Sequence, residues 1–260
     1  MSSRYAFLRS GVWIVGLLIA FLTVILFASL GMWQLQRLDE RQALNTTVES
    51  RMAAEPIEFG VLLAENGVDP EVLEYRRVTV AGIYGVEDEI ILQARTLNSR
   101  SGHNVVTPLA WEGGVVAVNR GWVPIDSEGP PVPTARPPDG EVVVTGILLT
   151  SEERGPTGVE NPDGSYDNIG RLDLALLEPQ WGPGLAGVYV QLEAQDPPQG
   201  AFPVPLPPPE IGEGPHLSYA IQWFVFALII MIGFPSLVVS TARRPRPTTS
   251  ASPSIPSSGA

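Results

Sequence analysis

One of the two histidines of this 260-residue chain stands where a polar, proline-rich segment meets a long apolar run. After His216, the residues Tyr219, Ala220 and Trp223 follow at helical spacing, so the four share one face of an expected helix. A neutral imidazole in this position can ligate a metal, and aromatic side chains beside it can cover a flat apolar ligand. The alternative is an interfacial anchor, because aromatic residues are common where membrane helices meet water.

A second group of candidate residues, Trp33, Gln34 and Arg37, follows the first apolar run. If both runs are membrane helices, this group and His216 lie on the same side of the membrane. His216 then has the chemistry of an axial ligand to haem iron, and Arg37 that of a partner for haem propionates. The expected pocket walls are Trp33, Tyr219 and Trp223. The open alternative is an aromatic belt with a snorkelling arginine and no ligand.

A third candidate lies in the segment 119–124, Asn-Arg-Gly-Trp-Val-Pro. In a continuous strand Arg120 and Trp122 would point to one face, where they could form a cation–π contact and a ledge for a partner protein. The alternative is a strand end that needs glycine and proline to turn. His103 is the other histidine, and no hydrolase, phosphate-loop, zinc-protease or dinucleotide pattern accompanies it. We therefore expect no enzymatic activity.

Two elements must position these residues. Residues 11–32 and 217–240 are uncharged, and each is long enough to cross a membrane as a helix. All 28 acidic residues lie between them, whereas the only charged residues in the two tails are arginines. The positive-inside rule therefore predicts cytoplasmic termini, an extracytoplasmic middle and a bacterial cell membrane protein with two spans.

Composition excludes several classes of protein. The chain has no cysteine, which rules out a disulfide scaffold, thiol chemistry and thiolate metal sites. Its middle part carries 11 arginines and 28 acidic residues, a net charge of 11 − 28 = −17, so we expect no nucleic acid partner.

The middle part alternates short β-rich runs with turn signals, so we predict an α+β membrane protein in which two transmembrane helices flank a mainly antiparallel β-sheet or small barrel. A short helix is expected near 58–65, and 151–165 is expected to be a loop. The predicted organisation is a cytoplasmic tail 1–10, a transmembrane helix 11–33, a helical extension 34–55, an extracytoplasmic β-rich domain 56–195, a proline-rich tether 196–215, a transmembrane helix 216–240 and a disordered cytoplasmic tail 241–260.

Five motifs, in this order, resemble the Surfeit locus protein 1 family of cytochrome c oxidase assembly factors. They are Gly-Met-Trp-Gln-Leu-Gln-Arg-Leu at 31–38, Arg-Arg-Val-Thr-Val-Ala-Gly at 76–82, Gly-His-Asn-Val-Val-Thr-Pro-Leu at 102–109, Val-Asn-Arg-Gly-Trp-Val-Pro at 118–124 and His-Leu-Ser-Tyr-Ala-Ile-Gln-Trp-Phe at 216–224. The resemblance covers residues 12 to 240.

The resemblance implies a membrane chaperone that assists maturation of cytochrome c oxidase, with the catalytic subunit or assembly intermediates of the oxidase as partners. It also implies transient binding of haem a, with His216 as the ligand of the haem iron, and it carries the Gly-x-Trp-Gln motif over to Gly31, Trp33 and Gln34. Two alternatives are a haem-free scaffold that binds oxidase subunits through the β domain and a two-span sensor or envelope-organising protein.

Overall fold

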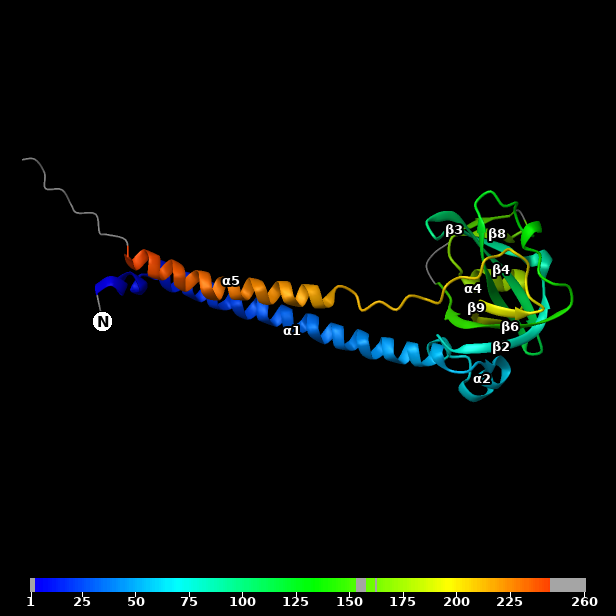
Figure 1. The fold of residues 1–260 in the computed structure, drawn as a ribbon, viewed down its shortest axis with the longest axis horizontal. Coiled ribbons are helices and arrows are strands. Elements are labelled where there is room, and N and C mark those ends of the chain that lie inside the picture. The colour runs from blue at the N-terminus through cyan, green and yellow to red at the C-terminus, as the bar shows by residue number, and fades with distance from the viewer. Residues whose placement is uncertain (1–2, 153–157, 162, 244–260) are drawn as a thin grey trace, which may run out of the picture. The chain divides into compact units, whose positions relative to one another are not determined.

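A computed structural model describes residues 3–152, 158–161 and 163–243 (Figure 1). The α-helices are α1 (Gly11–Ala53), α2 (Phe59–Asn66), α3 (Pro70–Leu73), α4 (Leu174–Trp181) and α5 (His216–Arg243). The 3-10 helices are η1 (Ser3–Arg9), η2 (Val86–Asp88) and η3 (Pro133–Ala135). The strands are β1 (Ile57–Glu58), β2 (Arg77–Tyr84), β3 (Ile90–Leu97), β4 (Arg100–Trp111), β5 (Gly114–Pro124), β6 (Glu141–Thr150), β7 (Gly158–Glu160), β8 (Tyr166–Ile169) and β9 (Leu185–Asp196).

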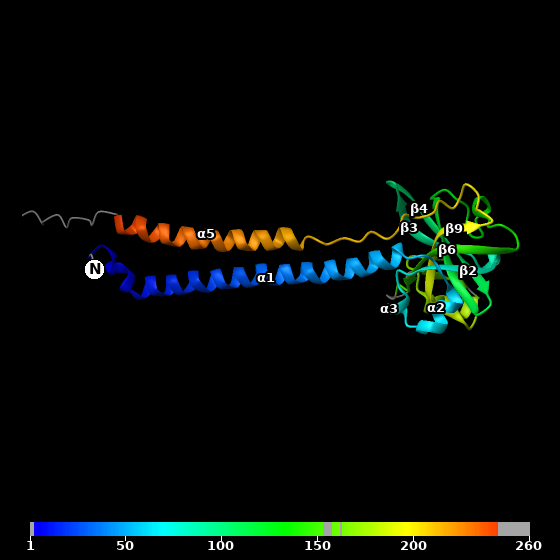
Figure 2. The ribbon, with the colours of Figure 1, turned by 60° about the horizontal axis from the view of Figure 1, so that its bottom comes forward.

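The chain forms two compact units, one from the described parts of 1–44 and 212–260 and one from 45–211. In the first unit, α1 and α5 lie side by side and run in opposite directions (Figure 1, Figure 2). Both helices are long and apolar enough to cross a membrane. Residues 244–260 of the predicted disordered tail 241–260 lie outside the described residues.

The second unit is built on a nine-stranded sheet that closes on itself. The strand order is β1-β2-β6-β9-β5-β4-β3-β8-β7, and an additional pairing of β2 with β4 joins five of these strands into a ring. The pairs β1–β2, β3–β8 and β5–β9 are parallel and the others are antiparallel. Six of the nine strand pairs among the described residues are therefore antiparallel, so the sheet is mainly antiparallel, as the sequence predicts. It is nevertheless mixed: β9, for example, is antiparallel to β6 on one side and parallel to β5 on the other.

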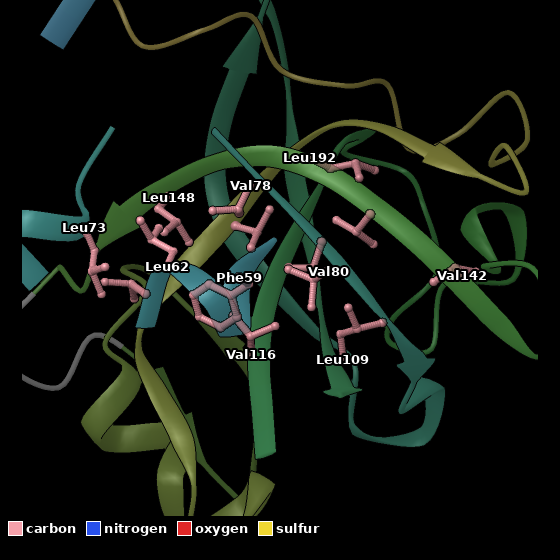
Figure 3. Close-up of a cluster of buried hydrophobic side chains, with 14 of the residues drawn as sticks. Phe59, Leu62, Leu73, Val78, Val80, Leu109, Val116, Val142, Leu148 and Leu192 are labelled. Atoms are coloured by element: carbon pink, nitrogen blue, oxygen red, sulfur yellow. The ribbon is translucent and has the colours of Figure 1, made fainter. Parts of the chain in front are cut away.

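Alternating side chains of β2 explain why this strand lies in the wall of the barrel. Val78 and Val80 are buried while Ile83 on the opposite face is exposed, as the period-2 pattern predicts. Figure 3 shows the core that these valines enter, together with Phe59 and Leu62 from α2. Burial of this apolar cluster is the main favourable term that holds the barrel together.

Two short segments test the remaining predictions. The helix expected near 58–65 is α2, which the Glu58 carboxylate caps through the backbone N–H groups of Gly60 and Val61. The segment 151–165 was expected to be a loop throughout, but it contains a short strand, β7, which pairs with β8. Residues 153–157 and 162 of that loop lie outside the described residues.

The proline-rich segment is not a free tether over its whole length. The backbone groups of Trp122 and Val204 exchange two hydrogen bonds of 2.8 Å, and the side-chain amide of Gln191 donates to the carbonyl oxygen of Pro207 at 2.9 Å. The segment therefore contacts the barrel as far as Pro207. Sequence composition misses this, because an extended proline-rich chain can still offer single N–H and C=O groups to a strand edge.

Replacing Gly121 by alanine is expected to open the contact between this segment and β5. Gly121 has φ +127°, and a Cβ there would collide with the carbonyl oxygen of Val204. Backbone strain of this kind should speed hydrogen exchange of the Trp122 and Val204 amides roughly ten- to hundredfold, measured by mass spectrometry. Gly129→Ala is the control, since nothing lies within 4 Å of its Cβ position. Equal exchange in the Gly121→Ala variant and the parent protein would refute the role of this glycine.

Candidate functional site

Glycine, alanine and aromatic side chains let α1 and α5 pack closely. A Cβ on Gly31 would lie 2.8 Å from ring carbons of Phe224, so only glycine permits this approach without a shift of the ring. Ala220 is buried, and the rings of Phe27 and Trp223 lie 5.3 Å apart between centroids. This packing brings the segment of α1 that follows Gly31 next to the first residue of α5.

His216 is that first residue, and its imidazole forms a hydrogen bond with Gln34 of α1. Its Nδ1 lies 2.9 Å from Oε1 of Gln34. An amide oxygen only accepts hydrogen bonds, so with the Gln34 amide in this orientation Nδ1 is the donor, and the lone pair of a neutral ring is on Nε2. This is the arrangement that orients a histidine ligand and makes it a better donor to a metal.

Gly214 places no side chain against the Nε2 edge of the imidazole. A Cβ at this position would lie 3.3 Å from both Nε2 and Cδ2 of His216, and the residue has φ +71°. A larger residue would therefore be strained in its backbone and would press against the nitrogen that carries the lone pair.

A hollow of about 370 Å³ lies beside His216, and Arg37, Glu40, Arg41 and Leu44 line it from α1. Nη1 of Arg37 donates to Oε2 of Glu40 at 2.6 Å. In the turn before His216, the Glu213 carboxylate accepts a hydrogen bond of 3.1 Å from the side-chain amide of Gln42. The end of the helix pair thus presents one imidazole and two guanidinium groups around a shared space.

Of the three aromatic residues predicted to form the pocket walls, one packs between the helices and two lie on their outer surfaces. Trp223 packs against Phe27 between the helices. Trp33 and Tyr219 are about half exposed, with exposed fractions of 51% and 47%, and neither lines the hollow. The structure therefore brings together His216, Gln34 and Arg37, and leaves Trp33 and Tyr219 on the outer surfaces of their helices.

The sequence profile of the SURF1 family matches residues 21–228. This range contains Gln34, the barrel and His216. The chain belongs to the SURF1 family. Membership implies a role in the assembly of cytochrome c oxidase.

Relatives in the SURF1 family extend over most of the chain. An uncharacterised SURF1-like protein of Mycobacterium bovis is 28% identical over 257 residues, which cover 96% of this chain and 92% of the relative. A SURF1-like protein of Monosiga brevicollis is 28% identical over 214 residues, covering 78% of this chain and 79% of the relative. Surfeit locus protein 1 of Mus musculus is 33% identical over 148 residues, covering 51% and 47%.

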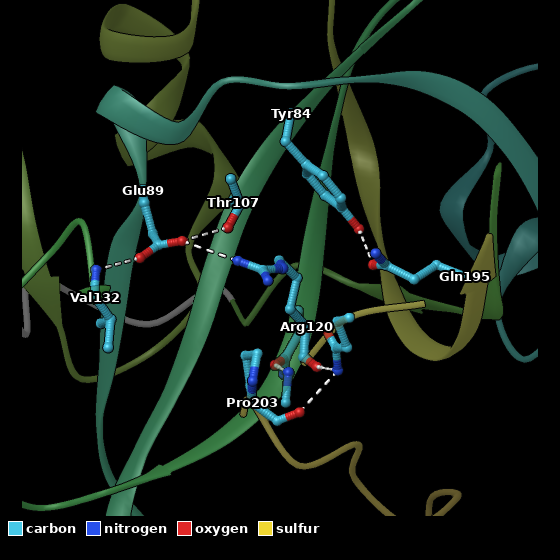
Figure 4. A network of polar contacts seen from close by, with 10 residues as sticks. Tyr84, Glu89, Thr107, Arg120, Val132, Gln195 and Pro203 are labelled. Carbon is cyan, nitrogen blue, oxygen red and sulfur yellow. Dashed lines mark hydrogen bonds and ion pairs between the residues drawn. The ribbon is translucent and has the colours of Figure 1, made fainter. Parts of the chain in front are cut away.

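Elsewhere in this SURF1-family chain, Arg120 is part of a buried network and does not form a ledge (Figure 4). It is 0% exposed, and its Nη1 donates to Oε2 of Glu89 at 3.2 Å. The same carboxylate accepts hydrogen bonds from the Thr107 hydroxyl at 2.9 Å and the Val132 backbone N–H at 2.8 Å. Burial raises the pKa of Glu89, and these three hydrogen bonds and the guanidinium charge oppose the rise.

Trp122 is buried as well, so neither side chain of the expected docking ledge reaches the surface. The guanidinium of Arg120 lies over the ring of Tyr84, and that of Arg100 lies over Trp122, so the expected contact between Arg120 and Trp122 is absent. The reason is a β-bulge in β5: Val105 pairs with Gly121 and Val106 with Asn119, which leaves Arg120 unpaired and re-aims its side chain.

Two features of the site were not predicted from the sequence. Arg41 follows Gln34 by seven residues and Arg37 by four, so helical spacing alone could have placed it beside His216. No sequence pattern indicates that Gly214 approaches the imidazole, because that contact depends on the turn before α5.

Proposed function

We propose that the protein binds haem a at the end of the α1–α5 pair that carries His216 and passes it to the catalytic subunit of cytochrome c oxidase. The observation that carries this proposal is the bond between Nδ1 of His216 and Gln34, which leaves Nε2 free to ligate iron. The residues present fit the group, since the Nε2 edge is kept clear by Gly214.

The donor set around His216 favours a metal that brings its own ligands. Among the described residues, no group of three or more His, Cys, Asp and Glu side chains could hold a bare metal ion. Haem iron already has four porphyrin nitrogens and needs only one or two axial ligands from a protein. In this role haem a is cargo, and the chain's own part is to bind it and to keep it oriented.

Other residues complete the proposed site. Arg37 is proposed to lie near the haem propionates, since it lines the hollow beside His216. Trp223 is proposed as part of the apolar wall. Trp33 and Tyr219, which are half exposed on the helix surfaces, are proposed to cover the porphyrin from the lipid side.

The proposal places the site at the extracytoplasmic surface of the bacterial cell membrane. The acidic residues all lie between the two uncharged runs, 11–32 and 217–240, while arginines flank the outer ends of both runs, among them Arg9 and Arg243. This charge distribution supports cytoplasmic termini. The barrel would then be extracytoplasmic, on the same side as His216.

The experiment that tests the proposal is the absorption spectrum of the full-length protein purified in detergent from cells that make haem a. We expect bound haem a, up to one per chain, identified by its pyridine complex. Haem-free protein that still captures oxidase subunits would favour the alternative, a haem-free scaffold. That scaffold would have to use residues other than Arg120 and Trp122, since both are buried.

Replacing Gln34 by leucine is expected to weaken haem a binding roughly 10- to 100-fold, the usual effect of losing a hydrogen bond that orients a histidine ligand. Without the amide oxygen the Nδ1 proton loses its acceptor, so the imidazole is less well oriented. Spectroscopic titration with haem a measures the change. Gln36→Leu is the matched control, because Gln36 is exposed on the same helix. Equal affinities of the two variants would contradict the role of Gln34.

A further inference from the structure

Two arginines one helical turn apart line the hollow beside His216, but they differ in what they already contact. Arg37 forms its ion pair with Glu40 at 2.6 Å. In the part of the chain that the structure describes, Arg41 has neither a hydrogen bond nor an ion pair with another side chain. The hollow therefore contains one neutralised pair and one unpaired guanidinium.

We infer that Arg41, and not Arg37, is the arginine that recognises the carboxylates of the haem, an inference that rests on the proposed function. The ligand class that this position selects is a flat metal complex with free acidic side chains. His216 and Arg41 line the same hollow, so one ligand can contact both. A guanidinium and a carboxylate form charge-assisted hydrogen bonds, which are stronger than those between neutral groups.

The other charges around the hollow support this assignment. Glu40 already accepts from Arg37, and Glu213 already accepts from Gln42, so both carboxylates have donors of their own. The first turn of α5 contains no acidic residue, so the positive end of its helix dipole also favours an anion there. The lining of the hollow carries two guanidinium groups and one carboxylate, a net charge of 2 − 1 = +1, and Arg41 is the guanidinium that the ion pair leaves over.

The role of Arg37 is then indirect. Its guanidinium neutralises Glu40, whose carboxylate would otherwise repel a propionate in the same hollow. Removing Arg37 alone should weaken haem binding, and removing both members of the pair should restore it. When Arg41 is removed, the additional loss of Glu40 should not restore haem binding.

The test compares two ligands that differ only in their acidic groups, haem a and its dimethyl ester. Each is titrated into the full-length protein in a neutral detergent without lipid, so that no phosphate headgroup competes. We expect the parent protein to bind haem a roughly ten- to hundredfold more tightly than the ester. In Arg41→Gln this preference should fall to about one, with the affinity for the ester unchanged.

Three further variants make the result specific. Arg37→Gln combined with Glu40→Gln should keep the preference for haem a, whereas Arg41→Gln combined with Glu40→Gln should not. Arg136→Gln, which removes the same charge from an exposed side chain of the barrel, should behave as the parent protein. An Arg41→Gln variant that retains the full preference, or that loses both ligands equally, overturns the inference. If the parent protein binds neither ligand, the proposed function itself fails.

Discussion

Replacing His216 by alanine is expected to lower the haem a content of the purified protein roughly tenfold or more, because the variant has no nitrogen to ligate the iron. The bond to Gln34 is lost at the same time. Circular dichroism should show an unchanged barrel, since His216 belongs to the helical unit. The haem content is measured by absorption after purification from cells that make haem a.

His103 provides the matched control for this substitution, as the only other histidine of the chain. It lies in β4 of the barrel, and His103→Gln should leave the haem content unchanged. A His216→Ala protein with the haem content of the parent would refute the ligand assignment. Equal losses in both variants would point to an effect on folding or expression.

Replacing Arg120 by methionine is expected to lower the free energy of unfolding of the barrel by about 3–5 kcal/mol, the usual cost of leaving one charge of a buried pair uncompensated. Arg120 and Glu89 are both buried, and the guanidinium is the only positive charge that contacts the carboxylate among the described residues. Urea unfolding of the full-length protein in detergent, followed by tryptophan fluorescence, measures the loss.

The effect should depend on pH through Glu89. Burial already raises its pKa above the ordinary value of 4.5, and loss of the guanidinium charge raises the pKa further. The folded state then binds a proton more readily than the unfolded state, so stability increases as the pH falls toward 4.5. The deficit of Arg120→Met should therefore be largest at neutral pH and shrink in acid.

Two variants separate this cause from a general packing defect. Glu89→Gln in the Arg120→Met background should recover much of the lost stability at neutral pH, because no buried charge remains. Arg77→Met removes an ion pair with Glu193 whose side chains are 28% and 26% exposed, so we expect a loss of only about 0.2–1 kcal/mol. A deficit of Arg120→Met that is independent of pH and of Glu89→Gln would contradict this account.

Local patterns in the sequence predict much of the fold. The apolar spacing beyond Trp33 predicts that the first helix continues far past the span, and α1 ends at Ala53. The alternation around Val78 and Val80 predicts a half-buried strand, and β2 has that burial pattern. These features depend on neighbouring residues only, and the periods of helix and strand differ enough to separate them.

Features that depend on distant contacts could not be predicted. The pairing of Ile83 with Ala110 closes the barrel, and no local pattern contains it. Arg120, which was expected at the surface, is buried, as are all residues from 116 to 123 of β5, because other elements cover both faces of this strand. At the candidate site, the sequence predicted that Gln34 and His216 lie on the same side of the membrane, but their hydrogen bond depends on how the helices are rotated against each other.

The central claim is that Nε2 of His216 ligates haem iron, and pulsed electron paramagnetic resonance of the ferric haem complex tests it most directly. The protein is made with ¹⁵N-histidine in the His103→Gln background, so that His216 is the only labelled residue. We predict strong hyperfine coupling from Nε2, the nitrogen bound to iron, and weak coupling from Nδ1, the remote nitrogen that is hydrogen-bonded to Gln34. A haem-loaded protein without ¹⁵N coupling would contradict the claim.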